Sequence, residues 1–313
     1  MLISIGTLAL ASCAVYVWAR LNPSAATGLG ASLLRRLAGF RKQQISVGDQ
    51  VWPYLERGDR SATPVVMVHG FGADKDTWVG YGRMFDRSFR IVCPDLPGFG
   101  DATDTAFEDF SPRAQALRLL TFLDRCEIDE FHIVGSSMGG FIATWVALEA
   151  PDRARSLTLM NAAGVSGAEP SRMQPLVEAG ESPLVPTNVE ELNSVLSMLS
   201  VRQMWLPKFV RQHLLNNYLR HGVLWRKIFD QLVKAQQSDR LKDQLQSIKA
   251  PTLVVWGDQD EILHVSCAEV FAQRIPDSRQ LILKNVGHIP MFEAPLKTSE
   301  AQLQLMREAA ATS

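Results

Sequence analysis

The chain lacks the patterns of several common binding sites. Its four cysteines, Cys13, Cys93, Cys126 and Cys267, form no C-x-x-C pair, so we expect small buried thiols and neither a disulfide framework nor a zinc ribbon. G-x-G-x-x-G and Walker patterns are also absent, which argues against a glycine-rich phosphate loop. The net charge is only -1, and nothing indicates nucleic acid as a partner. We therefore expect neither a metal nor a cofactor.

Charge is missing from Leu2 to Ala19. A helix of this length spans roughly 27 Å, close to the hydrocarbon thickness of a bilayer, and predicts a single-pass membrane anchor over residues 1–21. A cleaved signal peptide is the alternative, but a basic n-region is lacking. The letters LASC, which end at Cys13, also look like a bacterial lipoprotein signal, yet AVYVW follows where a polar tether is expected.

An amphipathic segment follows at residues 22–44, and Leu29, Leu33, Leu37 and Phe40 recur there at helical spacing. This pattern predicts a helix that lies in the headgroup region. A surface helix packed on its own domain is the equal alternative. The basic residues of this part of the chain are Arg20, Arg35, Arg36, Arg41 and Lys42. They favour a cytoplasmic domain, at the inner membrane in a bacterium, but an interfacial helix explains the same charges, so the side of the membrane stays open. Small residues four apart in the apolar segment, such as Thr7 and Ala11, give a weak hint of a homodimer.

From residue 45 onward, short apolar runs alternate with helical patterns. Gly48 and Asp49 divide the first two runs and predict an antiparallel hairpin over 45–55. Six later runs have the composition of buried parallel strands: 65–68, 90–93, 132–134, 157–160, 252–255 and 280–283. Such alternation predicts an α/β fold with a mostly parallel sheet covered by helices on both faces. We expect its two parts at residues 45–164 and 241–313.

The alternation stops between residues 165 and 240, after the sixth of the eight predicted strands. This part has no convincing strand, and the helical stretches predicted over 189–199, 207–221 and 225–236 are rich in large apolar residues. We expect a helical lid that contributes an acyl-binding tunnel, although any one of these side chains could simply bury the lid against the core. The predicted tunnel residues are Trp205, Phe209, Leu214, Tyr218, Trp225 and Phe229.

The sequence GSSMG, residues 135–139, fits G-x-S-x-G between a predicted strand and a predicted helix. This arrangement is the nucleophile elbow, in which glycines allow a sharp turn that exposes a strained serine. Ser137 is then the nucleophile, and its position at the start of a helix favours negative charge in a tetrahedral intermediate. The alternative is a plain glycine-rich turn, which would not require a strand directly before it and a helix directly after it.

Partners for Ser137 occur in the order that the elbow requires. HGFG at residues 69–72 follows a predicted strand, so the amides of Phe71 and Met138 are the expected oxyanion donors, and His69 has a structural role. Of the six histidines, only His288 lies beyond the final predicted strand, where a general base is needed. Asp258 and Asp260 both follow the strand 252–255; we prefer Asp260, because two more residues let the chain turn back toward His288.

Together these segments resemble a known family. HGFG, DLPGFG at 95–100, GSSMGG, WGDQDEI and VGH are similar to α/β-hydrolases, specifically the membrane-anchored branch of monoacylglycerol lipases and bacterial membrane-bound lipases and phospholipases A. The resemblance covers residues 45–310. It implies that the acid is the last Asp of W-G-x-x-D, which is Asp260 here.

The resemblance and the apolar segment together predict the activity. We expect a membrane-anchored serine hydrolase that cleaves acyl esters of glycerolipids, with membrane lipids and fatty acyl chains as its partners. Related capped enzymes include esterases and C–C bond hydrolases of soluble substrates, which remain the alternative. A ligand receptor on a hydrolase scaffold is a remote one, because nucleophile, base, acid and oxyanion loop are all present.

Overall fold

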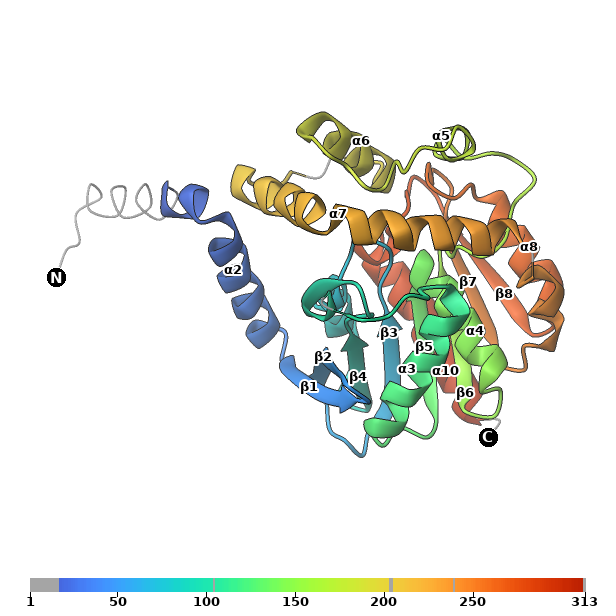
Figure 1. Ribbon diagram of the computed structural model, residues 1–313. Coiled ribbons are helices and arrows are strands. Elements are labelled where there is room, and N and C mark those ends of the chain that lie inside the picture. Colours follow the sequence, from blue (N-terminus) through green and yellow to red (C-terminus); the bar gives the residue numbers. More distant parts are fainter. Residues whose placement is uncertain (1–16, 104, 203–204, 239, 312–313) are drawn as a thin grey trace.

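The computed structural model describes residues 17–103, 105–202, 205–238 and 240–311, and their centre is an eight-stranded sheet in the order β1-β2-β4-β3-β5-β6-β7-β8 (Figure 1). Strand β2 is antiparallel to both β1 and β4, and all other neighbouring strands are parallel. The strands are β1 Arg41–Val47, β2 Gln50–Arg57, β3 Thr63–Val68, β4 Phe89–Pro94, β5 Phe131–Ser136, β6 Ala154–Met160, β7 Thr252–Gly257 and β8 Ser278–Leu283.

The six predicted buried runs fall on β3 to β8, and the predicted hairpin is β1 and β2. Strand β1, however, begins at Arg41 rather than at residue 45, so the expected amphipathic segment 22–44 overlaps it. Residues 41–44 are polar, so no hydrophobic pattern marks the start of this strand in the sequence. They pair with β2 at the edge of the sheet, where polar side chains remain at least partly exposed.

Helices cover both faces of the sheet, as predicted. On one face lie α3 (Pro112–Arg125), α4 (Met138–Glu149) and α8 (Ser266–Arg274); on the other lie α10 (Pro295–Ala311) and the short helices η1 (Lys75–Trp78) and η2 (Tyr81–Met84) (Figure 1). Strand side chains alternate between these layers, so Val66 packs with the first group and Val65 with the second. The remaining short helices are η3 (Gly100–Ala102), η4 (Lys242–Ser247) and α9 (Pro290–Glu293). Cys93, Cys126 and Cys267 are buried free thiols, as predicted, whereas Cys13 lies outside the described residues.

Three α-helices, α5 (Gln174–Glu178), α6 (Val189–Leu199) and α7 (Lys208–Gln237), lie between β6 and β7 and are followed there by the short helix η4; the described part of this segment contains no strand. The prediction of separate helices over 207–221 and 225–236 is wrong, because α7 is continuous for 30 residues. Gly222 does not interrupt it, since one glycine costs only about 1 kcal/mol in a helix. In Figure 1, α7 crosses above the carboxyl ends of the strands, with α5 and α6 beyond it. That these helices act as a lid stays a prediction.

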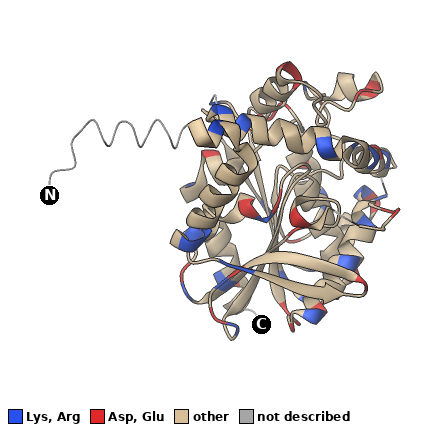
Figure 2. Ribbon diagram, turned by 60° about the vertical axis from the view of Figure 1, so that its left-hand side comes forward, with Lys and Arg blue, Asp and Glu red and all other residues tan. Residues whose placement is uncertain are grey.

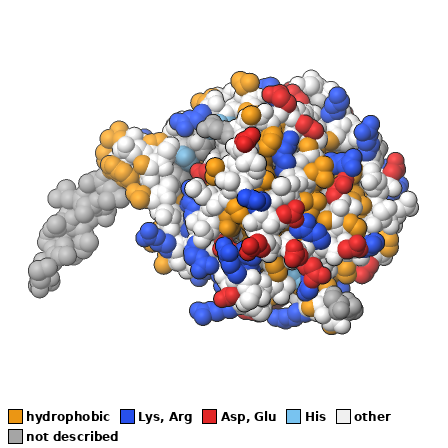
Figure 3. All heavy atoms as spheres, turned by 60° about the horizontal axis from the view of Figure 1, so that its bottom comes forward, with side chains coloured by type: hydrophobic (Ala, Val, Ile, Leu, Met, Phe, Trp, Pro, Cys, Tyr) orange, Lys and Arg blue, Asp and Glu red, His pale blue; other side chains and the backbone are white. Residues whose placement is uncertain are grey.

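Helix α2 (Pro23–Leu37) projects at the N-terminal end of the described chain (Figure 1). It has no buried residue, and Leu29, Leu33 and Leu37 are exposed. Figure 3 shows hydrophobic side chains gathered on this projecting part. The prediction that Phe40 shares this face is wrong, because Phe40 lies after the helix and is buried in the core.

Among the helices of the described residues, none is both long and apolar enough to cross a bilayer. Most of the predicted anchor, residues 1–21, lies outside the described residues, which begin at Val17. The small residues expected to pair two copies, Thr7 and Ala11 among them, lie outside as well. Over the rest of the described chain, Lys and Arg are interspersed with Asp and Glu (Figure 2), which agrees with the net charge of only -1.

Candidate active site

Ser137 occupies the turn between β5 and α4, with β5 ending at Ser136 and α4 beginning at Met138. Its φ is +56° and its ψ is -121°, a conformation that costs a residue with a side chain of order 1–3 kcal/mol. The Ser137 carbonyl accepts hydrogen bonds from the amides of Gly140 and Ala163, which hold the strained turn in place. The serine therefore lies at the positive end of the α4 dipole.

Glycines flank Ser137 because backbones approach one another too closely for any side chain. A Cβ on Gly135 would lie 2.2 Å from the carbonyl oxygen of Gly139, and one on Gly139 would lie 2.2 Å from that of Val68. The end of β5, the start of α4 and the end of β3 are thus in direct contact. This packing accounts for the glycines of the elbow.

The HGFG loop, residues 69–72, passes beside Ser137. A Cβ on Gly70 would lie 3.2 Å from the Cβ of Ser137. The ring of Phe71 packs edge-on against Phe99, with centroids 5.4 Å apart, and against Phe229 of α7, at 5.6 Å. Aromatic contacts from the loop after β4 and from α7 therefore hold the predicted oxyanion residue in place. Its other predicted donor, Met138, is the first residue of α4.

The side chain of His69 makes hydrogen bonds to two nearby backbone groups. Its Nδ1 bonds the Gly70 carbonyl at 2.8 Å, and its Nε2 accepts a hydrogen bond from the Leu96 amide at 3.0 Å. Burial lowers the pKa of His69 to about 4, so the ring is neutral near pH 7, with its proton on Nδ1. Both nitrogens are occupied, which fits the structural role expected for this histidine.

His288 and Asp260 meet at the carboxyl ends of the strands, where both are buried. His288 Nδ1 lies 2.8 Å from Asp260 Oδ2. Asp260 Oδ1 accepts hydrogen bonds from the amides of Ile262 and Leu263, at 2.8 and 3.0 Å. A carboxylate held in this way keeps the proton of the imidazole on Nδ1 and leaves Nε2 as the basic nitrogen.

Asn161 is a member of this network that the sequence reasoning missed. Its side-chain amide donates to Asp260 Oδ2 at 2.6 Å and to the Gly287 carbonyl at 3.2 Å. The residue directly follows β6 and has a φ of +47°. The sequence offered one signal for Asn161, because it is a polar residue directly after a predicted buried strand.

Asp258, the other candidate acid, makes its side-chain contacts with residues that follow β8. Its Oδ1 accepts a hydrogen bond from the Asn285 amide at 2.7 Å, and its carboxylate lies 3.8 Å from Lys284 Nζ. Both partners follow β8, so Asp258 joins the loops after β7 and β8. Of the two candidate acids, the structure brings only Asp260 to His288.

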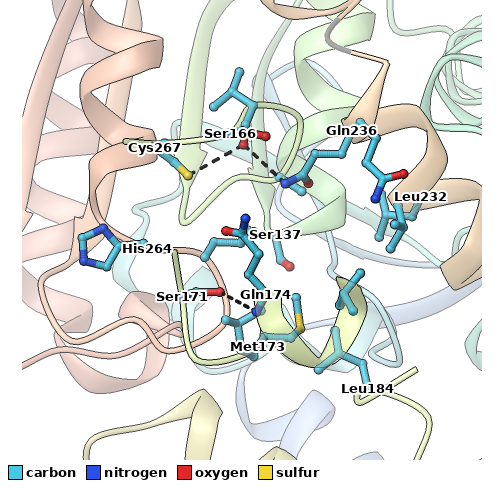
Figure 4. A pocket seen from close by; sticks show the side chains of 18 of the residues that line it. Ser137, Ser166, Ser171, Met173, Gln174, Leu184, Leu232, Gln236, His264 and Cys267 are labelled. Atoms are coloured by element: carbon cyan, nitrogen blue, oxygen red, sulfur yellow. Dashed lines mark hydrogen bonds between the residues drawn. The ribbon is translucent and has the colours of Figure 1, made fainter. Parts of the chain in front are cut away.

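Ser137 lines a cavity of about 330 Å³ that lies between the sheet and the helices α5, α7 and α8 (Figure 4). The volume lies at the lower end of the range for small-molecule sites. The polar lining residues include Ser166, Gln174, Gln236 and His264. The apolar lining comprises Phe71, Val165, Met173, Val177, Leu184, Phe229, Leu232, Val233, Ile262 and Leu263.

Of the six predicted tunnel residues, only Phe229 lines this cavity. Leu214, Tyr218 and Trp225 line a second cavity of about 450 Å³ between α2 and α7. Trp205 is 83% exposed, and neither it nor Phe209 lines either cavity. Leu232 and Val233 were missed, although their spacing from Phe229 places them on the same side of α7. Residue type alone could not show which side of this helix faces Ser137.

Within the residues that the structure describes, no group of three His, Cys, Asp or Glu side chains is arranged to hold a metal ion.

Comparison with known proteins gives concordant results. Residues 63–295 match the alpha/beta hydrolase fold family. The chain is similar to monoacylglycerol lipase ABHD6 of Bos taurus, with 32% identity over 94% of this chain and 90% of that protein. It is also similar to Lipase 1 of Psychrobacter immobilis, with 30% identity over 82% of this chain and 80% of that one. Among solved structures, a bacterial membrane phospholipase A superposes with a TM-score of 0.87 and 32% identity, covering 97% of this chain and 96% of the other.

Proposed function

The chain belongs to the α/β-hydrolase fold family and is a lipase-type serine hydrolase, and from this premise we propose that it hydrolyses acyl esters of glycerolipids through an acyl-enzyme on Ser137. One observation carries the proposal: the strained Ser137 and the HGFG loop border the same mainly apolar cavity, and the Asp260–His288 pair lies at the same edge of the sheet.

The mechanism follows from the chemistry of these groups. His288 Nε2 takes the proton of the Ser137 hydroxyl as Oγ attacks the ester carbonyl, and Asp260 stabilises the imidazolium that forms. The amides of Phe71 and Met138 donate to the oxyanion, and the α4 dipole adds to this stabilisation. His288 then protonates the leaving alcohol. In the second half of the reaction it activates the water that releases the fatty acid.

The lining of the Ser137 cavity favours a lipid with an uncharged head group. The apolar residues suit an acyl chain, whereas the hydroxyl and amide groups suit glycerol hydroxyls. Among the described residues, no lysine or arginine lines this cavity, but Glu169 and Glu178 do, and carboxylates disfavour a neighbouring phosphate. A monoacylglycerol is therefore the preferred substrate, the class named for the Bos taurus relative. Hydrolysis of diacyl phospholipid, the class named for the similar bacterial phospholipase A, is expected to be slower.

A membrane position fits this substrate. The uncharged segment from Leu2 to Ala19 would anchor the chain, and the exposed leucines of α2 would lie at the acyl boundary. Long-chain lipids are scarce as monomers in water, so an enzyme held at the bilayer meets them at high local concentration. Similarity to a bacterial membrane phospholipase A supports such a location.

The decisive experiment measures hydrolysis of a monoacylglycerol, a lysophospholipid and a diacyl phospholipid by the full-length protein in detergent, together with Ser137 labelling by a fluorophosphonate. We expect labelling of the wild type and the highest kcat/KM for the monoacylglycerol. Ser137→Ala and His288→Ala should lower kcat by roughly three orders of magnitude or more while the fold stays intact. Activity close to that of the wild type in either variant would refute the mechanism. A higher kcat/KM for the lysophospholipid or the diacyl phospholipid than for the monoacylglycerol would refute the choice of head group.

A further inference from the structure

Helix α2 is joined to the hydrolase core by few polar contacts. None of its residues is buried. Near its start, Ser24 Oγ lies 3.0 Å from His213 Nδ1 of α7. Near its end, Arg35 binds the Asp76 carboxylate through Nε and a terminal nitrogen, each to a separate oxygen. Such a bidentate pair fixes both the position and the orientation of its two partners.

Asp76 belongs to a short segment, residues 74–76, that begins one residue after the HGFG loop. Asp74 Oδ1 accepts a hydrogen bond from the Asp76 amide at 2.8 Å. Lys75 is buried; its Nζ lies 2.6 Å from Asp95 Oδ2 and 2.8 Å from Asp101 Oδ2. Segment 74–76 is thus held from two sides, by the carboxylates of Asp95 and Asp101 after β4 and by Arg35 of α2.

This segment lies close to the reacting atoms along the chain. Only Gly72 and Ala73 separate it from Phe71, and the Ala73 amide donates to the Gly70 carbonyl at 3.4 Å in a tight turn. Gly70 in turn is packed against Ser137. A shift of segment 74–76 therefore changes the direction of the Phe71 amide. Such groups must be held within about 0.5 Å of their productive position, and a misplacement of about 1 Å can cost about a hundredfold in rate.

We propose that Arg35 is a positioning residue for the reaction, which acts through Asp76 to hold the HGFG loop in the geometry that stabilises the oxyanion. This inference rests on the proposed function of Phe71 and Ser137. It makes α2, which follows the apolar N-terminal segment, part of the machinery that orients the oxyanion donor. The helix would then serve catalysis as well as attachment.

The position of the ion pair separates this role from a contribution to stability. The side chains of Arg35 and Asp76 are 17% and 25% exposed. An exposed ion pair adds at most about 1 kcal/mol to the free energy of unfolding, and bidentate geometry with partial burial increases this contribution, so removing the pair should lower the melting temperature by about 2–4 °C. Its effect on kcat should be much larger than this change implies.

The test compares Arg35→Gln and Asp76→Asn with the full-length wild type in detergent, on a soluble short-chain ester that needs no membrane delivery. We expect kcat to fall about tenfold and KM to stay within about twofold, because binding of the ester is not altered. The double variant should be no worse than either single one, since both remove the same contact. Arg35→Lys, which keeps the charge but loses the fork, should recover part of kcat.

Arg155→Gln is the matched control. Arg155 also binds a carboxylate through Nε and a terminal nitrogen, although both bind the same oxygen of Glu130 and the pair is more exposed; it lies at the opposite, N-terminal edge of the strands, so its loss should leave kcat unchanged. Wild-type kcat in Arg35→Gln would overturn the inference, as would an equal loss in Arg155→Gln or a loss that parallels the melting temperature. If the wild type itself does not hydrolyse the ester and Ser137 is not labelled, the proposed function fails instead.

Discussion

At the scale of single residues, the distinction between Asp258 and Asp260 depends on hydrogen-bond partners. Asp260 accepts four hydrogen bonds, from the Ile262 and Leu263 amides, Asn161 and His288. An amide in its place can accept at one atom only, so one side of the network loses its acceptor. Asp258 needs a single acceptor atom for the Asn285 amide, which asparagine also provides.

Asp260→Asn should therefore lower kcat on a short-chain ester by roughly three to four orders of magnitude, because His288 is no longer held with its proton on Nδ1. Asp258→Asn should keep kcat within a few-fold of the wild type. Thermal unfolding of both variants provides the control for folding. A larger loss of kcat at Asp258 would reverse the assignment of the acid.

At the scale of elements, α7 lines both the Ser137 cavity and the second cavity next to α2. Its first half contacts α2 through His213 and lines the second cavity with Leu214 and Tyr218. Its second half lines the Ser137 cavity with Phe229, Leu232 and Val233. Between them, Trp225 donates from Nε1 to the Gly98 carbonyl at 2.9 Å, which fixes the rotation of the helix about its own axis. The half that faces Ser137 should then limit the length of the acyl chain.

Leu232→Phe and Leu232→Trp fill part of the Ser137 cavity, so they should lower kcat/KM for a long-chain monoacylglycerol by about tenfold, the equivalent of about 1.4 kcal/mol. Hydrolysis of a short-chain ester should change little. Val223→Trp is the matched control, because Val223 is 90% exposed on the same helix. A chain-length profile identical to that of the wild type, or a change in melting temperature alone, would contradict the proposed acyl site.

At the scale of the whole molecule, α2 lies along the chain between the apolar N-terminal segment and the hydrolase core. The exposed leucines of α2 and the uncharged residues before Ala19 are adjacent along the chain. The proposed anchor precedes α2, so removing residues 1–20 should leave α2, its Arg35–Asp76 pair and the active site intact.

Deletion of residues 1–20 should release the protein from membranes while activity on a soluble short-chain ester is retained. Activity on a long-chain lipid in vesicles should fall strongly, because delivery from the bilayer is lost. Fractionation and vesicle assays with the full-length and truncated proteins provide the measurement. Equal activity of both proteins on vesicles would show that the anchor does not help to supply substrate.

Much of the fold and part of the site were predictable from local patterns. Buried strands show as short apolar runs, and the elbow shows because its strand, its glycines and its helix are contiguous around Ser137. His288 was identifiable from its place after the last strand. The edge strand β1 was harder to delimit, because polar residues at a sheet edge have little hydrophobic signal.

Local sequence patterns were sufficient to predict the sheet, the elbow and the residue types available for catalysis, because each depends on neighbours along the chain. Tertiary packing of the loops after β7 and β8 then established that Asp260, which the sequence favoured, and not Asp258 meets His288. It also decided that Phe229, and not Trp205, reaches the Ser137 cavity, and that Arg35 joins α2 to the segment after the HGFG loop. These contacts bring together residues far apart in the chain, and their directions are set by packing, which no local pattern encodes.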